Sequence, residues 1–163
     1  MATNKIPGKW RKRTIGVRGA TMRSHFQETS EALFLTSGYA YENAEEAEAR
    51  FKGEIPGYQY SRYANPTVTM FEERMAMLEG APVAQATATG MAAVSAALLS
   101  ALNAGDHIVA AKAMFGSCLN VVTEILPRFG VSHTSVDGSD VAQWKAALKP
   151  NTRMLFLETP SNP

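Results

Sequence analysis

The sequence contains a single cysteine, Cys118, so no disulfide can form within the chain. This is typical of a protein from a reducing compartment, and we expect a cytoplasmic location. No apolar run approaches the roughly 20 residues of a membrane-spanning helix, and no membrane association is expected. The histidines, at positions 25, 107 and 133, are too scattered for a metal site, so no metal is expected.

Several catalytic and nucleotide-binding signatures are also missing. The sequence has no G-x-G-x-x-G motif and no Walker lysine after a glycine-rich loop, which argues against a dinucleotide and a nucleoside triphosphate. It has no H-E-x-x-H motif, and no Ser-His-Asp order can be assembled.

Acidic residues are absent before Glu28, whereas the first 27 positions contain seven Lys and Arg residues. The remainder carries nine basic and fifteen acidic residues. We interpret residues 1–27 as an extended arm that lies on an acidic partner surface. An Arg-rich transit peptide is the alternative, although proline and glycine interrupt this segment. Aromatic residues are not interleaved with the basic ones as base stacking requires, so no nucleic acid is expected.

What is present is an ordinary globular composition, with 45% hydrophobic and 19% charged residues. A short helix is predicted over 43–53, with Asn43 as N-cap and Gly53 at its end. Residues 54–66 read as a loop, and an amphipathic helix follows Pro66 and ends at Gly80. Beyond it, strands (82–88, 106–114, 131–138, 152–159) alternate with helices (89–105, 116–130, 139–150), with Ser139 as the cap of the last helix.

Apolar strands that alternate with helices indicate an α/β fold with a mostly parallel sheet and helices on both faces, preceded by the extended arm. We place a boundary between an arm with a short helix (1–55) and a sheet-containing domain (56–163). In such sheets ligands bind beyond the carboxyl ends of the strands. Candidate functional residues are therefore sought there.

Two features are suited to an anion. Gly90 and Met91 open a predicted helix, and their N–H groups would face a phosphate, although a plain tight turn is the simpler explanation. In the segment YSRYANPT (60–67), Arg62 offers a bidentate guanidinium and Tyr60 a hydroxyl. A surface arginine beside a packed tyrosine is the alternative. Two such features in one chain favour a phosphorylated ligand.

Three further residues lie just after predicted strands. The ring of Phe115 could stack on a planar heterocycle, or be a core side chain. Glu158 and Asn162, in LETPSNP (157–163), could hydrogen-bond a ring hydroxyl and a substrate, or form an Asx turn. Cys118 is expected to be packed inside a helix, and Lys112 to be a surface lysine rather than a nucleophile.

In order along the chain, ALFLTSGY, YSRYANPT, LEG, TGMAA, FGS and ETPSNP resemble the Cys/Met-metabolism family of pyridoxal-5′-phosphate (PLP) enzymes. The resemblance covers about Glu31 to Pro163. It implies the first part of the aspartate-aminotransferase-like (fold type I) large domain and PLP as cofactor. Tyr60 and Arg62 would reach the PLP phosphate of a neighbouring subunit in a homotetramer built as a dimer of dimers.

The resemblance also implies the other roles. Gly90 and Met91 would bind the phosphate of the chain's own PLP, Asn162 the ring hydroxyl, and Glu158 would line the substrate pocket. Phe115 would stack on the ring where most members have tyrosine, which fits the sulfhydrylase branch and argues against a γ-lyase that needs a phenol.

The family's Schiff-base lysine is expected beyond Pro163, so no catalytic residue is assigned in the chain, which would be inactive without a C-terminal remainder. The implied reaction is γ-replacement on O-succinyl-L-homoserine with sulfide to give L-homocysteine, a step of methionine biosynthesis. Cystathionine γ-synthase, O-acetylhomoserine sulfhydrylase and a non-catalytic cofactor-holding or interaction half-domain are the alternatives.

Overall fold

The computed structural model describes residues 10–162. The first nine residues of the basic arm and Pro163 lie outside the described residues. The chain divides into two compact units, one ending at Ala86 and one beginning at Thr87, and each is described by itself. The boundary that the sequence suggests between residues 55 and 56 stays a prediction. None of the described helices is long and apolar enough to cross a membrane.

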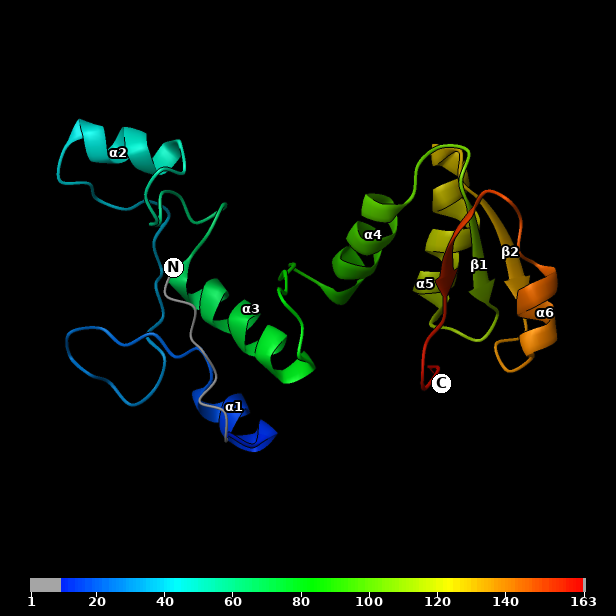
Figure 1. Cartoon of the computed structure of the whole chain (residues 1–163), viewed down its shortest axis with the longest axis horizontal. Coiled ribbons are helices and arrows are strands. Elements are labelled where there is room, and N and C mark those ends of the chain that lie inside the picture. The colour runs from blue at the N-terminus through cyan, green and yellow to red at the C-terminus, as the bar shows by residue number, and fades with distance from the viewer. Residues whose placement is uncertain (1–9, 163) are drawn as a thin grey trace. The chain divides into compact units, whose positions relative to one another are not determined.

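The described part of the first unit, residues 10–86, contains three helices, α1 (Lys12–Arg18), α2 (Ala44–Phe51) and α3 (Pro66–Glu79) (Figure 1). The expectation of an extended arm is wrong for residues 12–18, because α1 is helical. Helix α1 contacts α3 and buries Ile15. The carbonyl of Gly19, directly after α1, accepts a hydrogen bond from Arg74 Nε at 2.8 Å. Tertiary packing on α3 therefore supports a helix too short to be stable alone.

The ends of α2 and α3 lie where local sequence signals predict them. The side chain of Asn43 accepts from the N–H of Glu46 at 2.7 Å and begins α2. Asn65 accepts from the N–H of Thr67 at 2.9 Å before Pro66 opens α3. Gly80 ends α3 with a φ of 67°, a left-handed conformation in which a side chain would be strained. These helix boundaries are confirmed.

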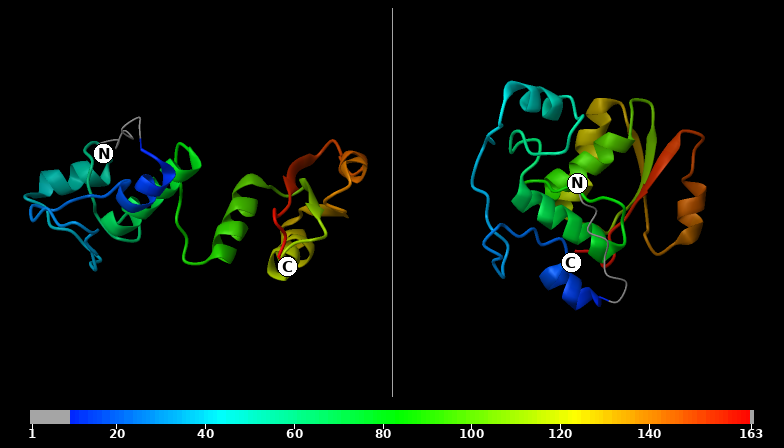
Figure 2. Two further views of the ribbon diagram at one scale, coloured as in Figure 1. Left: turned by 90° about the horizontal axis from the view of Figure 1, so that it is seen from below. Right: turned by 60° about the vertical axis from the view of Figure 1, so that its left-hand side comes forward.

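The second unit is built on a parallel sheet in the order β2-β1-β3 (Figure 1, Figure 2). Its strands are β1 (His107–Ala111), β2 (Ser132–Val136) and β3 (Thr152–Phe156), and β1 pairs in parallel with both neighbours. The helices are α4 (Gly90–Ala101), α5 (Gly116–Asn120), η1 (Val121–Ile125), η2 (Leu126–Phe129) and α6 (Val141–Ala146). The three strands predicted beyond residue 105 are confirmed, with a parallel arrangement.

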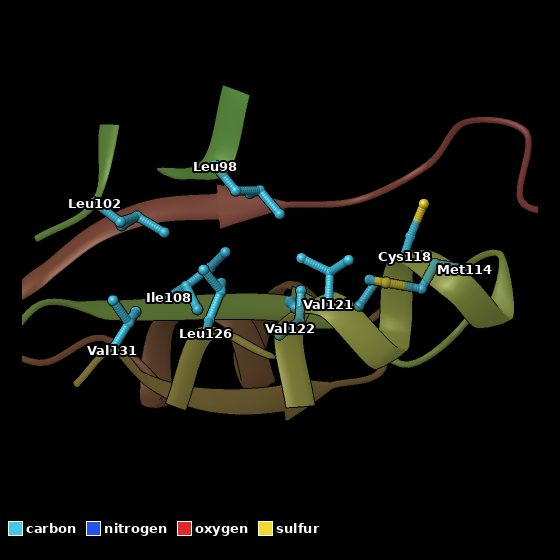
Figure 3. Packing of buried hydrophobic residues seen from close by; sticks show 11 residues of the cluster. Leu98, Leu102, Ile108, Met114, Cys118, Val121, Val122, Leu126 and Val131 are labelled. Atoms are coloured by element: carbon cyan, nitrogen blue, oxygen red, sulfur yellow. The ribbon is translucent and has the colours of Figure 1, made fainter. Parts of the chain in front are cut away.

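The core of the second unit lies between β1 and the helices that flank it in sequence (Figure 3). Leu98 and Leu102, from α4 and the residue after it, meet Ile108 of β1. Val122 and Leu126 pack against the same cluster from η1 and η2, and both are fully buried. Every residue of β1 is buried, as expected of the central strand of a covered parallel sheet.

A buried histidine joins all three strands. His107, at the start of β1, is fully buried. Its Nδ1 lies 2.8 Å from Oγ1 of Thr152 in β3, and its Nε2 lies 2.9 Å from Oγ1 of Thr134 in β2. Burial, and after it the charge of Lys149 and the neighbouring His133, lowers the pKa of His107. The ring is therefore held neutral as a polar bridge across the sheet.

The prediction of a strand over residues 82–88 is wrong. These residues form no strand, and Val83 is largely exposed. The N–H of Ala86 and the side-chain amide of Gln85 both donate to the Glu72 carboxylate of α3 at 2.7 Å. A strand forms only beside a partner, and the sheet of residues 10–162 offers none here.

Two helices differ from expectation in detail. Asp140, not Ser139, caps α6, since its Oδ1 accepts from the N–H groups of Ala142 and Gln143, whereas Ser139 Oγ donates to Asp137 at 2.7 Å. The helix predicted over 116–130 is continuous but changes from α to π to 3₁₀ geometry. Pro127 has no N–H for an α-helical bond, and the altered pitch accommodates it.

Candidate functional site

The carboxyl ends of β1 and β3 bring two of the predicted site residues into contact. Phe115 follows β1 and begins α5, and Glu158 follows β3. Because neighbouring parallel strands end at the same edge of a sheet, the two loops meet there. The N–H of Phe115 donates to Oε2 of Glu158 at 2.9 Å. Phe115 is 42% exposed, so it is available to a ligand rather than packed in the core.

The carboxylate of Glu158 also lies near the backbone of Asn162, the residue predicted to bind a ring hydroxyl. The N–H of Phe115, followed by the thiol of Cys118, hydrogen-bonds the Glu158 carboxylate and lowers its pKa. The N–H of Asn162 adds to this lowering. Glu158 is therefore ionised at neutral pH, and the backbone of Asn162 is brought to the same point as Phe115.

The amino end of α4 provides N–H groups suited to an anion. Thr89 is the N-cap, with its hydroxyl accepting from the N–H of Ala92 at 3.0 Å and its carbonyl from Ala93 at 3.1 Å. Among the described residues, no acceptor takes the N–H groups of Gly90 and Met91. A Cβ built on Gly90 would meet nothing within 4 Å, so a ligand can approach this backbone closely. The 12-residue helix adds the positive end of its dipole.

Cys118 connects this helix end to the carboxylate. Its thiol donates to the sulfur of Met91 at 3.9 Å and lies beside the Glu158 carboxylate. Figure 3 shows the Cys118 side chain pointing away from α5 towards the segment that follows β3. Burial, and after it Glu158, raises the pKa of the thiol. The expectation that Cys118 is packed is confirmed, because the residue is buried, but its contacts with Met91 and Glu158 were not anticipated.

Tyr60 and Arg62 belong to the first unit, where a small network presents them. Gly38 and Tyr60 form an isolated antiparallel bridge, and the N–H of Ser61 donates to the carbonyl of Ser37 at 2.9 Å. The guanidinium carbon of Arg62 lies 4.5 Å from the Tyr63 ring centroid and 5.6 Å from that of Tyr60.

Arg62 is exposed, and within residues 10–162 its guanidinium makes no hydrogen bond or ion pair. Stacking on two rings orients the cation while leaving its N–H groups unused. This arrangement is suited to binding an anion from outside the segment. Sequence reasoning missed the contacts that hold this loop. Arg50 Nη1 donates to the carbonyl of Tyr58 at 3.2 Å, and the side chain of Gln59 donates to the carbonyl of Arg50.

The family of the chain follows from comparison with known proteins. A family model described as Cys/Met metabolism PLP-dependent enzyme matches residues 13–163. The chain belongs to this family. Its cofactor is PLP, and its fold is that of the PLP-dependent fold type I enzymes.

Individual members of the Cys/Met-metabolism family show how far the similarity extends. The chain is 55% identical over 158 residues to an O-succinylhomoserine sulfhydrylase of Mycobacterium tuberculosis, which covers 97% of this chain and 39% of that protein. It is 48% identical over 150 residues to an O-succinylhomoserine sulfhydrylase of Pseudomonas aeruginosa, covering 92% of this chain and 37% of that protein. The chain thus spans about two fifths of the length of these relatives.

A solved structure agrees with this similarity. It is an O-acetylhomoserine (thiol)-lyase of Campylobacter jejuni that carries N′-pyridoxyl-lysine-5′-monophosphate. The TM-score is 0.87 at 29% identity, with 95% of this chain and 38% of that chain covered.

Several residues of this chain are suited to bind particular parts of PLP. The open backbone at Gly90 and the unused N–H groups of Gly90 and Met91 suit a phosphate. The exposed ring of Phe115 suits a flat pyridine face. In the described part of the chain no group of three His, Cys, Asp or Glu side chains could hold a metal ion.

Proposed function

We propose that these residues form the amino-terminal part of a PLP-dependent enzyme that replaces the γ-acyloxy group of O-succinyl-L-homoserine with sulfide and releases L-homocysteine. The observation that carries this proposal is the 55% identity, over 97% of this chain, to a relative named for that substrate. The second sulfhydrylase relative, at 48% identity, supports it. The succinyl group and sulfide both belong to the proposal, because the family acts on several related substrates.

In this proposal the chain holds and orients the cofactor. When bound, PLP supplies the electron sink for chemistry at the substrate's α- and β-carbons. Gly90 and Met91 would hold its phosphate through their N–H groups, and Phe115 would lie against its ring. Asn162 would hydrogen-bond the ring hydroxyl. Glu158 is predicted to line the substrate pocket, and its carboxylate accepts a hydrogen bond from the N–H of Phe115.

Phe115 limits what this position can do. A phenyl ring can cover one face of a heterocycle and exclude water, but it has no hydroxyl to take or give a proton. Proton transfer must therefore come from another group. This favours a replacement reaction over a γ-elimination that relies on a phenol at this place.

We also propose that Tyr60 and Arg62 bind the phosphate of a neighbouring subunit's cofactor, within a homotetramer that is a dimer of dimers. Their support is the exposed guanidinium held over two rings without an anionic partner among the described residues. Size-exclusion chromatography with light scattering tests the assembly, and a monomeric cofactor-loaded enzyme would contradict it.

The test of the function compares two esters and two nucleophiles. The protein that contains these residues is purified and assayed with O-succinyl- and O-acetyl-homoserine, each with sulfide and with cysteine. We expect homocysteine from the succinyl ester and sulfide at the highest kcat/KM. Preference for cysteine would indicate a cystathionine γ-synthase instead.

The similarity to the O-acetylhomoserine (thiol)-lyase structure of Campylobacter jejuni makes O-acetylhomoserine the second candidate substrate. A higher kcat/KM for that ester would assign the enzyme as an O-acetylhomoserine sulfhydrylase. The absence of turnover with all four pairs would leave a cofactor-holding or interaction module.

Borohydride reduction followed by intact-mass measurement separates catalysis from mere cofactor holding. We expect one reduced pyridoxyl phosphate per protomer, on a lysine outside the 17.6 kDa of residues 1–163. An adduct on Lys112 would contradict the assignment of that residue as a surface lysine. A protein with no adduct would contradict the enzyme proposal.

A further inference from the structure

The carboxylate of Glu158 joins two loops that are far apart in sequence. One loop links β1 to α5 and contains Phe115, and the other follows β3 and contains Asn162. The N–H of Phe115 donates to Oε2 at 2.9 Å. The thiol of Cys118 and the N–H of Asn162 lie near enough to the same carboxylate to lower its pKa. No cation forms an ion pair with Glu158 among residues 10–162, so hydrogen bonds rather than a salt bridge lower the pKa of its carboxyl group.

The N–H of Phe115 and the polar hydrogens near it require a group that accepts. An ionised carboxylate offers acceptor sites on both oxygens and no hydrogen. A glutamine of the same length offers one acceptor oxygen in place of two and carries no charge, so it would bind these hydrogens less well. The requirement at this position is therefore for a carboxylate, and the lowered pKa of Glu158 agrees with it.

Phe115 needs this anchor because packing does not hold its ring. The ring is 42% exposed, and as N-cap of α5 the residue makes no side-chain capping bond. Its carbonyl accepts from Leu119 at 3.0 Å, which fixes the helical side of the residue. The bond from its N–H to Glu158 fixes the other side. Together the two bonds determine where the exposed ring points.

We propose that Glu158 is a positioning residue: its carboxylate binds the N–H groups of Phe115 and Asn162 and so holds the Phe115 ring and the Asn162 loop in the geometry that the cofactor needs. This inference rests on the proposed function for the use of that geometry, and on contacts within the second unit for the geometry itself. It assigns Glu158 an indirect role and removes it from the substrate contacts.

The first test uses the full chain without cofactor, with Glu158→Gln compared with Glu124→Gln. Glu124 is exposed in η1, so its substitution removes the same charge from the same unit. Cys118 is the only cysteine of residues 1–163, and within them its reaction with 5,5′-dithiobis(2-nitrobenzoate) therefore reports on this site alone.

We expect the thiol to react about tenfold faster in Glu158→Gln, because the carboxylate that disfavours the thiolate is gone. Glu124→Gln should react at the wild-type rate. Equal rates in the two variants would overturn the proposal.

A second measurement on the wild-type chain needs no substitution and remains decisive if Glu158→Gln does not fold. Amide hydrogen exchange at Phe115 should be slow for a residue on an exposed loop, because its N–H is bound to the carboxylate. Exchange at the rates of an unstructured peptide would overturn the proposal.

The third test uses the assembled, cofactor-loaded enzyme. For Glu158→Gln we expect a weaker visible circular dichroism band of the bound cofactor and a kcat about 10- to 100-fold lower, with KM for the homoserine ester unchanged. Glu158→Asp keeps an acceptor-only group and should retain more of the dichroism band. A raised KM with an unchanged band would show direct contact with substrate and overturn the positioning role.

The tests separate failure of this inference from failure of the proposed function. Thiol reactivity and amide exchange are measured without cofactor or substrate, so they report on Glu158 whatever reaction the enzyme performs. A chain that passes both but turns over no homoserine ester would contradict the function alone. A working sulfhydrylase in which Glu158→Gln behaves like Glu124→Gln would contradict the inference alone.

Discussion

The guanidinium of Arg50 lies directly against Gly57, where a Cβ atom would come within 2.8 Å of Nε. Arg50 Nη1 donates to the carbonyl of Tyr58 at 3.2 Å, and the guanidinium carbon lies 5.4 Å from the centroid of the Tyr41 ring. Arg50 also forms an ion pair with Glu46 one turn earlier in α2. The absence of a side chain at position 57 thus lets α2 hold the loop that leads to Tyr60.

We predict that Gly57→Ala displaces the Arg50 guanidinium and lowers the free energy of unfolding by about 1 kcal/mol, the contribution of one hydrogen bond. Urea denaturation measures this. In an Arg50→Ala background the same change at Gly57 should have almost no effect, because the contact is already gone. Gly16→Ala is the control, since a Cβ there meets no atom within 4 Å. Additive effects of the Arg50 and Gly57 changes would contradict the contact.

The buried imidazole of His107 predicts a loss of stability in mild acid. Its folded pKa is lowered from the ordinary value of 6.5, so the unfolded chain binds more protons as the pH falls. The contribution of His107 is complete above about pH 6.5 and declines below it. Urea midpoints at about pH 7.5 and pH 5.5 measure the loss while staying above the carboxylate titrations.

His107→Asn should be less stable than wild type at the higher pH, since it leaves Thr134 or Thr152 without its partner. It should lose less stability between the two pH values, because no imidazole remains to be charged. His25→Gln, at an exposed position, controls for removal of a histidine as such. An identical pH response in His107→Asn and wild type would contradict the assignment.

Neighbouring leucines of α4 test where the core lies. Leu98 is 1% exposed and belongs to the core cluster, whereas Leu99 is 41% exposed. We predict that Leu98→Ala lowers the free energy of unfolding by about 2–5 kcal/mol, because it removes buried methyl groups and leaves a cavity. Leu99→Ala should lower it by less than about 1 kcal/mol. Similar losses from both variants in urea denaturation would contradict this core.

Arg62 tests the proposed phosphate contact. In the assembled enzyme, Arg62→Ala should weaken PLP binding by about 1.5–3 kcal/mol, the contribution of a charge-assisted hydrogen bond. Arg62→Lys should weaken it less, since it keeps the charge but loses the bidentate geometry. Equilibrium dialysis measures the affinity, and Arg13→Ala, at an exposed position in α1, is the charge-matched control. Unchanged affinity in Arg62→Ala would remove its phosphate role.

Predictions from the sequence were most accurate where neighbouring residues carry the whole signal. Asn43 begins α2 and Gly80 ends α3 as predicted, because caps act on the backbone within one turn. They failed at residues 82–88, whose strand character needs a partner strand. They also failed at Ser139, because two adjacent residues can cap a helix and Asp140 is the one whose carboxylate points at its N–H groups.

Predictions for the candidate site were likewise accurate for the positions of its residues but not for the contacts between them. The positions of Gly90, Phe115 and Glu158 at strand and helix ends follow from hydrophobic patterning and turn residues in the sequence. That the N–H of Phe115 donates to the carboxylate of Glu158 does not, since the two residues lie 43 positions apart in the sequence.

The sequence by itself determined the alternation of helices and strands in the second unit, most helix ends and the family, because these depend on local hydrogen bonding, side-chain periodicity and ordered motifs. Tertiary structure alone decided three contacts. These are the hydrogen bonds of His107 to both neighbouring strands, the close approach of Arg50 to Gly57, and the hydrogen bond from Phe115 to Glu158. Each of these joins groups that only folding brings within hydrogen-bonding or van der Waals distance.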